Sequence, residues 1–252
     1  MPEKGFRHRR IPQFRHVFDL THFDPFDSVF EVTNGDSNSI GKELVTHIET
    51  VLDDIFDPLP KNLSTHNTVK ILFETLAGFD EYTAQHSQEN GEVGEILARA
   101  CGIQDKKRLL NLRRAALLHD IGKIGILSVL HQSVQPGRRL EFRMLHAHFT
   151  RYILQKFPSL SEVESIASAI HVKQKGKSYP PDLNWDTIPY EAKILSVADA
   201  LHSITHERPG DGAKSRTEAL DILRRYGYDE GIVDVLEQIL PQIPERLIPD
   251  IQ

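Results

Sequence analysis

The sequence predicts an all-α protein, in which a bundle of helices follows an irregular N-terminal arm. From Ser39 onward, apolar residues recur at steps of three and four, the period of an amphipathic helix. No stretch shows the alternation of β-branched residues that would support a sheet. Glycine and proline separate the helical stretches, and residues 174–184 (QKGKSYPPDLN) read as a loop.

Each of the first four predicted helices stops at a residue that disfavours helix. The first stops before Pro58 and the second at Gly78, while Gly102 and Gly122 follow the third and fourth. The predicted helices cover 39–57, 62–77, 81–100, 106–120, 139–157, 160–172, 188–206, 215–226 and 230–240.

Residues 1–38 form the irregular arm, since they carry three prolines and the turn sequence Asn34-Gly35-Asp36. The arm also carries several phenylalanines, which we expect to pack on the main domain or on a protein partner. Its basic residues could contact phosphates, although a solvated arm is the more ordinary interpretation. We therefore divide the chain into 1–60, the arm plus one helix, and 61–252, the main domain.

The amino-acid composition argues against several classes of function. Thirty Lys+Arg against 36 Asp+Glu give a net charge of −6, which argues against general nucleic-acid binding. No apolar run reaches the roughly 20 residues needed to span a bilayer, and the basic N-terminus lacks the apolar core of a secretory signal, so we expect a cytoplasmic protein. The lone Cys101 excludes a disulfide framework and an all-thiolate metal site, and with 13 histidines present we expect nitrogen and oxygen as the metal ligands.

A set of histidines and aspartates lies on the apolar faces of the predicted helices or at a helix end. A single inward histidine is usually a hydrogen-bonded core residue, and a single inward aspartate usually pairs with arginine. Six such residues on five segments are harder to explain in this way, because a buried carboxylate is costly without a compensating cation. The donor set suits Fe, Mn or Zn better than Ca. The residues are His86, His119, Asp120, His146, His171 and Asp199.

These residues lie within motifs that resemble the HD phosphohydrolase superfamily, and specifically its HD-GYP subfamily. Residues 116–125 (ALLHDIGKIG) match the LLHDIGKIG signature without a break, and 82–87 (YTAQHS) resemble the opening motif. Residues 194–200 (ILSVADA) resemble the closing aspartate helix, and Arg208-Pro209 stand at the position of the family's RPY. The resemblance covers roughly 62–240.

The resemblance implies a site with two divalent ions, Fe or Mn. His86, His119, Asp120 and Asp199 would hold one ion, and Asp120 would bridge to a second ion held by His146 and His171. Catalysis would involve Asp120 and Lys123.

The substrate would be contacted by Lys123, Arg208 and Tyr179, and it would be a cyclic dinucleotide such as cyclic di-GMP. A homodimer would also be compatible with the resemblance.

The chain departs from the subfamily in several places. In the segment from His146 to Leu154, which resembles the family's HPxxGxxIL, Ala147 and Thr150 replace the proline and the glycine. Ile170 and Val172 replace a histidine and a glutamate of the HHExxDGxGYP segment, which removes one ligand of the second ion. Tyr82 replaces a glutamate that can hold a third ion, so we expect no three-metal site.

Three functions stay open from the sequence. The first is a metal-dependent cyclic-dinucleotide phosphodiesterase. The second is a degenerate HD-GYP domain that binds nucleotide or a protein partner without hydrolysis. The third is a simpler HD hydrolase with one metal that acts on nucleoside phosphates.

Overall fold

The computed structural model describes residues 39–126, 145–172, 182–207 and 212–249, and all regular secondary structure within these ranges is helical. This confirms the predicted all-α class. The N-terminal arm, 1–38, lies outside the described residues. The helices are α2 (Ser39–Phe56), α3 (Thr65–Phe79), α4 (Glu81–Ala100), α5 (Lys106–Leu118), α8 (His146–Gln155), α9 (Ser161–Ala167), α10 (Tyr190–Thr205), α11 (Arg216–Arg225) and α12 (Glu230–Ile239), with short 3₁₀ turns at Pro158–Leu160 and Leu240–Gln242.

Side-chain caps fix where several helices begin. Ser64, Asp80 and Asp105 accept hydrogen bonds from backbone amides in the first turns of α3, α4 and α5. Asp80 thereby starts α4 directly after α3, so the two helices are joined without a loop. Gly102, with a φ of 89°, lets the chain turn away at the end of α4.

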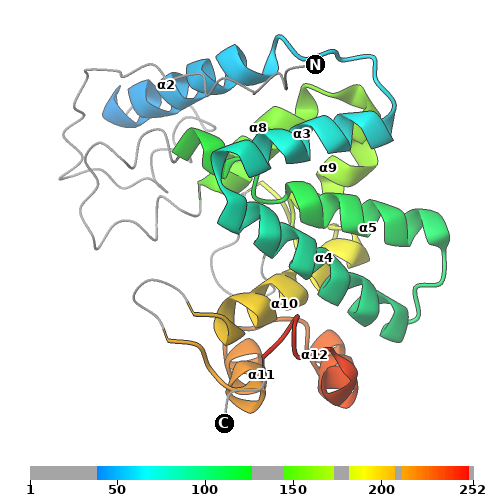
Figure 1. Cartoon of the computed structure of the whole chain (residues 1–252). Coiled ribbons are helices and arrows are strands. Elements are labelled where there is room, and N and C mark those ends of the chain that lie inside the picture. The colour runs from blue at the N-terminus through cyan, green and yellow to red at the C-terminus, as the bar shows by residue number, and fades with distance from the viewer. Residues whose placement is uncertain (1–38, 127–144, 173–181, 208–211, 250–252) are drawn as a thin grey trace, which may run out of the picture.

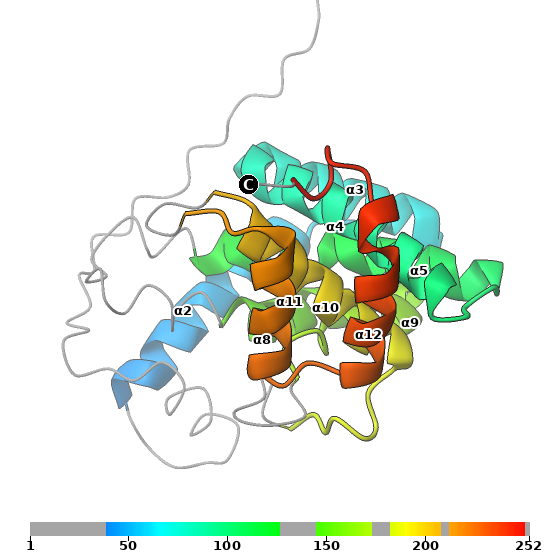
Figure 2. The same cartoon turned by 90° about the horizontal axis from the view of Figure 1, so that it is seen from below.

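Helix α4 lies at the centre of the molecule, with α5 and α10 packed against it (Figure 1). Leu97, Leu112 and Leu195, one from each of these helices, are fully buried in a single hydrophobic core. Helices α11 and α12 cover α10 at the end of the molecule opposite α2 (Figure 2). The three central helices therefore form a rigid frame that can hold polar side chains between them.

Helix α2 packs beside α8. Its residues Ile48 and Leu52 are fully buried, and they lie against the backbone at Gly125. Asp53 accepts hydrogen bonds from Tyr152, at 2.8 Å, and from Lys156, at 2.6 Å. Both apolar and polar contacts thus attach α2 to the rest of the bundle.

The predicted helix over 160–172 is wrong at its C-terminal end. Helix α9 stops at Ala167, and the chain continues in turns whose hydrogen bonds span three residues, from the amide of Ala169 to Ile166 and from that of Val172 to Ala169. His171 therefore lies on a turn instead of a helix. Turns with three residues per hydrogen bond direct side chains differently from an α-helix, so α-helical periodicity does not give the direction of the His171 side chain.

Among the described residues, no helix combines the length and apolar content that crossing a membrane requires.

Gly122 is required where α5 gives way to the next turn, because the backbone of α8 passes directly over it. A Cβ on Gly122 would collide with the carbonyl oxygen of His146 and the amide of Thr150, and would lie 2.9 Å from the carbonyl carbon of Phe149. These are backbone atoms, so no side-chain rotation can relieve the collision.

We expect Gly122→Ala to lower the free energy of unfolding by about 3 kcal/mol, measured by urea denaturation, because overpacking displaces main chain. Gly78→Ala is the matched control, since no atom lies within 4 Å of a Cβ there. In helix α3 that change should be neutral or stabilising by up to about 1 kcal/mol. Equal effects of the two substitutions would contradict the interpretation.

Candidate metal centre

The site is built around His119 and Asp120, which follow the last turn of α5. Both residues are buried. The Nδ1–H of His119 donates to the carbonyl oxygen of Ala116 at 2.7 Å. This bond engages Nδ1 and leaves Nε2 as the His119 nitrogen directed into the site, which is the arrangement that metal-binding histidines commonly show.

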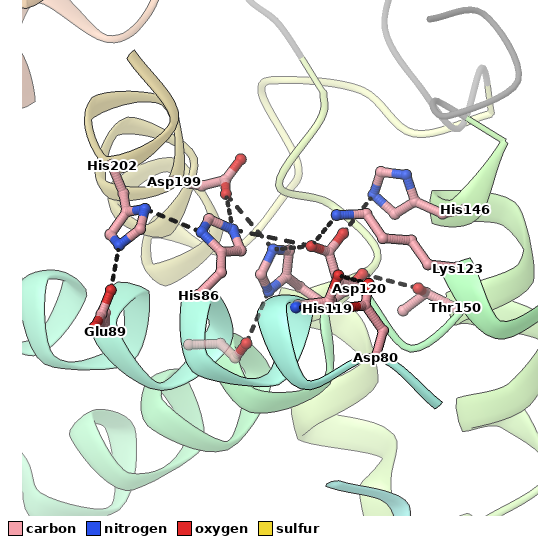
Figure 3. A network of polar contacts seen from close by, with 12 residues as sticks. Asp80, His86, Glu89, His119, Asp120, Lys123, His146, Thr150, Asp199 and His202 are labelled. Carbon is pink, nitrogen blue, oxygen red and sulfur yellow. Dashed lines mark hydrogen bonds and ion pairs between the residues drawn. The ribbon is translucent and has the colours of Figure 1, made fainter. Parts of the chain in front are cut away.

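Helices α4 and α10 contribute His86 and Asp199 to one side of Asp120 (Figure 3). Oδ1 of Asp199 lies 2.9 Å from Nε2 of His86 and 3.5 Å from Nε2 of His119. Oδ2 of Asp120 lies 3.3 Å from Nε2 of His119 and 3.9 Å from Nε2 of His86. Two imidazoles and two carboxylates from three helices therefore converge.

The other carboxylate oxygen of Asp120, Oδ1, faces a second group of ligand atoms, which belong to His146 and His171. Oδ1 lies 3.1 Å from Nε2 of His146, at the start of α8, and that nitrogen lies 2.8 Å from Nε2 of His171. The structure thus brings together all six predicted residues, and the two oxygens of Asp120 point to different subsets of them.

The donor set fits divalent metal ions. Two ligands at about 2.1 Å from one ion and at right angles to each other lie about 3 Å apart. The nitrogen–oxygen separations of 2.9, 3.1, 3.3 and 3.5 Å are close to that value. His86, His119 and Asp120 each direct a ligand atom to one small region, which suits a shared ion.

The site has the electrostatics of a cation-binding centre. Burial alone would disfavour a charged His119, but Asp120 and Asp199 outweigh it and raise the pKa of His119 to about 10. Burial would likewise favour neutral carboxyls, yet the surrounding histidines and Lys123 hold the pKa of Asp120 well below its usual range. Asp199 shows the same direction, because His119 and His86 lower its pKa. Both carboxylates are therefore stabilised by positive charge close by.

His171 differs from the other histidines. Burial first, and the neighbouring His146 second, lower the pKa of His171 to about 3. A neutral imidazole has a lone pair to offer to a metal ion.

Lys123 pairs with Oδ2 of Asp120, and its side chain is 29% exposed. Its ammonium group therefore lies at the border between the buried carboxylate and solvent, where a substrate phosphate could reach it. Arg208 and Tyr179, the other predicted substrate contacts, lie outside the described residues.

The structure also describes two of the residues that depart from the subfamily pattern. Ile170, at the position of the missing histidine, is 2% exposed and belongs to the hydrophobic core. Tyr82, at the position of the glutamate for a third ion, is 56% exposed.

Thr150, which stands where the resembled HPxxGxxIL motif has a glycine, was not predicted as a site residue. Its hydroxyl donates to the carbonyl oxygen of His119 at 2.8 Å and accepts the amide of Gly122 at 3.1 Å. One side chain of α8 thereby holds both ends of the turn that carries Asp120. A polar residue on the buried face of a helix was the available signal.

The polar contacts behind His86 were also not predicted from the sequence. Nδ1 of His86 lies 3.1 Å from Nδ1 of His202, and Nε2 of His202 lies 2.8 Å from Oε2 of Glu89. Burial and the nearby His86 lower the pKa of His202 to about 4. The position of His202, three residues after Asp199 in α10, was the signal that it shares a helix face with the site.

A match to a known family model shows which protein family the chain belongs to. The HD domain family model matches residues 69–231, more than half of the chain. The chain belongs to the HD-domain family. Phosphohydrolases of this family are metal-dependent, and the buried histidines and aspartates of this HD domain include a group that could bind metal.

Curated relatives of this HD domain include 3'3'-cGAMP-specific phosphodiesterase 3 of Vibrio cholerae, 36% identical over 56% of this chain and 31% of that protein. The cyclic di-GMP phosphodiesterase of Thermotoga maritima is 29% identical over 56% of this chain and 39% of its own length. The cyclic di-GMP phosphodiesterase response regulator RpfG of Xanthomonas campestris is 30% identical over 62% and 43%, respectively. The matched part of this chain thus spans less than half of each relative.

Among solved structures, the HD domain of the phosphodiesterase PgpH from L. monocytogenes, in complex with cyclic-di-AMP, is similar in fold. The TM-score is 0.50 at 16% identity, over 72% of this chain and 99% of that one. The similarity agrees with the all-α bundle seen here.

Replacing Thr150 tests whether it holds the turn of Asp120. We expect Thr150→Val to lower the free energy of unfolding by about 1–3 kcal/mol, because it leaves the buried His119 carbonyl and Gly122 amide without a partner. Thr150→Ser keeps the hydroxyl and should retain most of that stability. Urea denaturation measures both variants, and a serine variant as unstable as the valine variant would contradict the role of the hydroxyl.

Proposed function

We propose that this chain is a metal-dependent phosphodiesterase of the HD-GYP type that hydrolyses cyclic dinucleotides. In this proposal residues 61–252 form the HD-GYP-like catalytic unit, and 1–60 form an N-terminal arm plus one helix. The observation that carries it is the convergence of five side chains of metal-binding type around Asp120, whose two oxygens face two different groups.

The proposed site holds two ions, with Fe or Mn as the expected metals. His86, His119, Asp120 and Asp199 would hold one, and Asp120, His146 and His171 would contribute to the other. When bound, two ions of this kind lower the pKa of a water molecule and neutralise charge on a phosphoryl group. His119, oriented by the carbonyl of Ala116, presents Nε2 to the site.

Lys123 would stabilise the negative charge that develops on the phosphoryl group. Its pairing with Asp120 places the ammonium within the site, and its partial exposure leaves it accessible to a phosphate. Arg208 and Tyr179 would add contacts to substrate.

The names of the relatives support the substrate class. Several are phosphodiesterases of 3'3'-cGAMP or of cyclic di-GMP. Each of these relatives is more than twice as long as the region matched. Enzyme assays with each cyclic dinucleotide are therefore needed to identify the substrate.

One observation favours a second function, a binding module without hydrolysis. Ile170, buried in the hydrophobic core, provides no ligand where the resembled subfamily has a histidine. The second ion would then have fewer protein ligands, and the domain could bind a nucleotide without cleaving it.

The first experiment measures bound metal and turnover together. We expect the purified full chain to contain Fe or Mn by elemental analysis and to hydrolyse cyclic di-GMP, 3'3'-cGAMP or cyclic di-AMP. His119→Ala and Asp120→Ala should abolish both properties, because they remove ligands, whereas His66→Gln, on the exposed surface of α3, should change neither.

Three results would separate the alternatives. Metal-loaded protein that binds these nucleotides but cleaves none, cyclic or linear, would contradict the phosphodiesterase and favour the binding module. Full activity in both His146→Ala and His171→Ala would contradict the two-ion site and favour a one-metal hydrolase. Absence of metal binding under any loading condition would contradict the metal centre itself.

A second prediction concerns Lys123. Lys123→Met should lower kcat by about 100-fold with metal content unchanged, because a preorganised positive group is lost from the transition state. Lys70→Met provides the control, since Lys70 lies on the surface of α3 in an exposed pair with Glu74. A Lys123 variant with normal kcat would exclude the lysine from the chemistry.

A further inference from the structure

Behind His86, on the side away from Asp120, three side chains form a continuous chain of polar contacts (Figure 3). Nδ1 of His86 lies 3.1 Å from Nδ1 of His202, whose Nε2 lies 2.8 Å from Oε2 of Glu89. Glu89 and His86 come from α4 and His202 from α10. Both imidazole rings are buried, so the contact between them is shielded from solvent.

The positions of the protons follow from Glu89. An ionised carboxylate only accepts hydrogen bonds, so Nε2 of His202 must carry a proton to donate to it. A neutral His202 then has a lone pair on Nδ1, and the contact with His86 requires the proton to be on Nδ1 of His86. With Nδ1 of His86 donating to His202, Nε2 is the nitrogen that faces Asp199 and Asp120. Asp199 accepts a hydrogen bond from the Nε2 proton in the metal-free protein, and a bound ion would take the Nε2 lone pair in place of that proton.

We propose that Glu89 and His202 are positioning residues that fix the tautomer of His86 and so present the Nε2 lone pair to the metal centre. This inference rests on the metal centre proposed above. The relay, defined as Glu89, His202 and His86, extends a pattern in which a carboxylate orients a metal-binding histidine, here with a second histidine inserted between the two.

A different interpretation of the same region is a separate metal site formed by Glu89, His202 and His206, whose ligand atoms lie close together. Two features argue against it. Nε2 of His202 carries the proton that Glu89 accepts, so it has no lone pair for an ion.

The second feature is the stacking of the two rings. The imidazoles of His202 and His206 are parallel within 4°, with centroids 3.7 Å apart. An imidazole lone pair lies in the plane of its ring, and one ion cannot lie in two parallel planes that are separated. Nδ1 of His206 instead donates to the carbonyl oxygen of His202 at 2.8 Å, so His206 supports the ring of His202 from one face.

The relay is tested by the affinity of the full chain for Mn²⁺, measured by competition with a chelator. His202→Leu removes the acceptor for His86 and should weaken Mn²⁺ binding about 10- to 100-fold. His202→Asn places a carbonyl oxygen near the position of Nδ1 and should restore affinity to within a few-fold of wild type. Glu89→Gln should weaken binding about 10-fold, because a carboxamide can donate as well as accept and no longer fixes the proton order.

Two controls accompany these variants. Glu92→Gln removes another carboxylate of α4, one that pairs with Arg246 at the surface, and should leave Mn²⁺ affinity unchanged. His206→Phe keeps a ring stacked on His202 and should leave both affinity and the number of bound ions unchanged. Thermal unfolding of each metal-free variant shows whether it is folded.

A spectroscopic measurement reads the tautomers directly. In the metal-free protein, the side-chain ¹⁵N shifts of histidine should show a protonated Nδ1 in His86 and a protonated Nε2 in His202. The shifts of His86 should move in Glu89→Gln and stay in place in Glu92→Gln.

The outcomes distinguish the relay from the metal centre on which it rests. Wild-type affinity in folded His202→Leu and Glu89→Gln would overturn the relay and leave the proposed function intact. Loss of one ion in His206→Phe would overturn it in favour of the separate metal site. Wild-type protein that binds no metal would contradict the proposed function, and the ¹⁵N shifts would then decide the relay alone, with the opposite tautomers overturning it.

Discussion

Two carboxylates held away from water impose the main constraint on this molecule. The side chains of Asp120 and Asp199 are 3% and 17% exposed, and no arginine contacts either of them among the described residues. An unpaired buried charge costs several kcal/mol, so positive charge has to be supplied at this point. Histidines from α4, α5 and α8, together with Lys123, surround the carboxylates, and the same arrangement is what a divalent cation requires.

The bundle meets this constraint through a few specific features. The end of α5 delivers two adjacent polar residues into the core, and Gly122 allows α8 to approach the turn without a collision. Thr150 then satisfies the main-chain groups on both sides of Asp120. His119 is therefore held by a main-chain hydrogen bond, and the turn that carries Asp120 is held by Thr150.

Much of the site could be predicted from sequence, because helical periodicity shows which polar residues face inward, and an unbroken motif of nine residues is specific. His171 shows the limit of this reasoning. Its distance from the other ligands depends on the turns after Ala167, which periodicity extended as a helix. Thr150, Glu89 and His202 were missed for a related reason, since their roles depend on which neighbouring helix they meet, and sequence spacing describes one helix at a time.

Helix α2 lies ahead of the region matched by the HD family, yet it reaches the segment that carries the signature. Ile48 and Leu52 rest on the backbone of Gly125, two residues beyond Lys123. A protein shortened to the matched residues 69–231 would lack α2 and would expose the apolar surface around Gly125 that Ile48 and Leu52 cover. Because Gly125 is only two residues from Lys123, a displacement of α2 would act on the backbone next to the turn that carries Asp120.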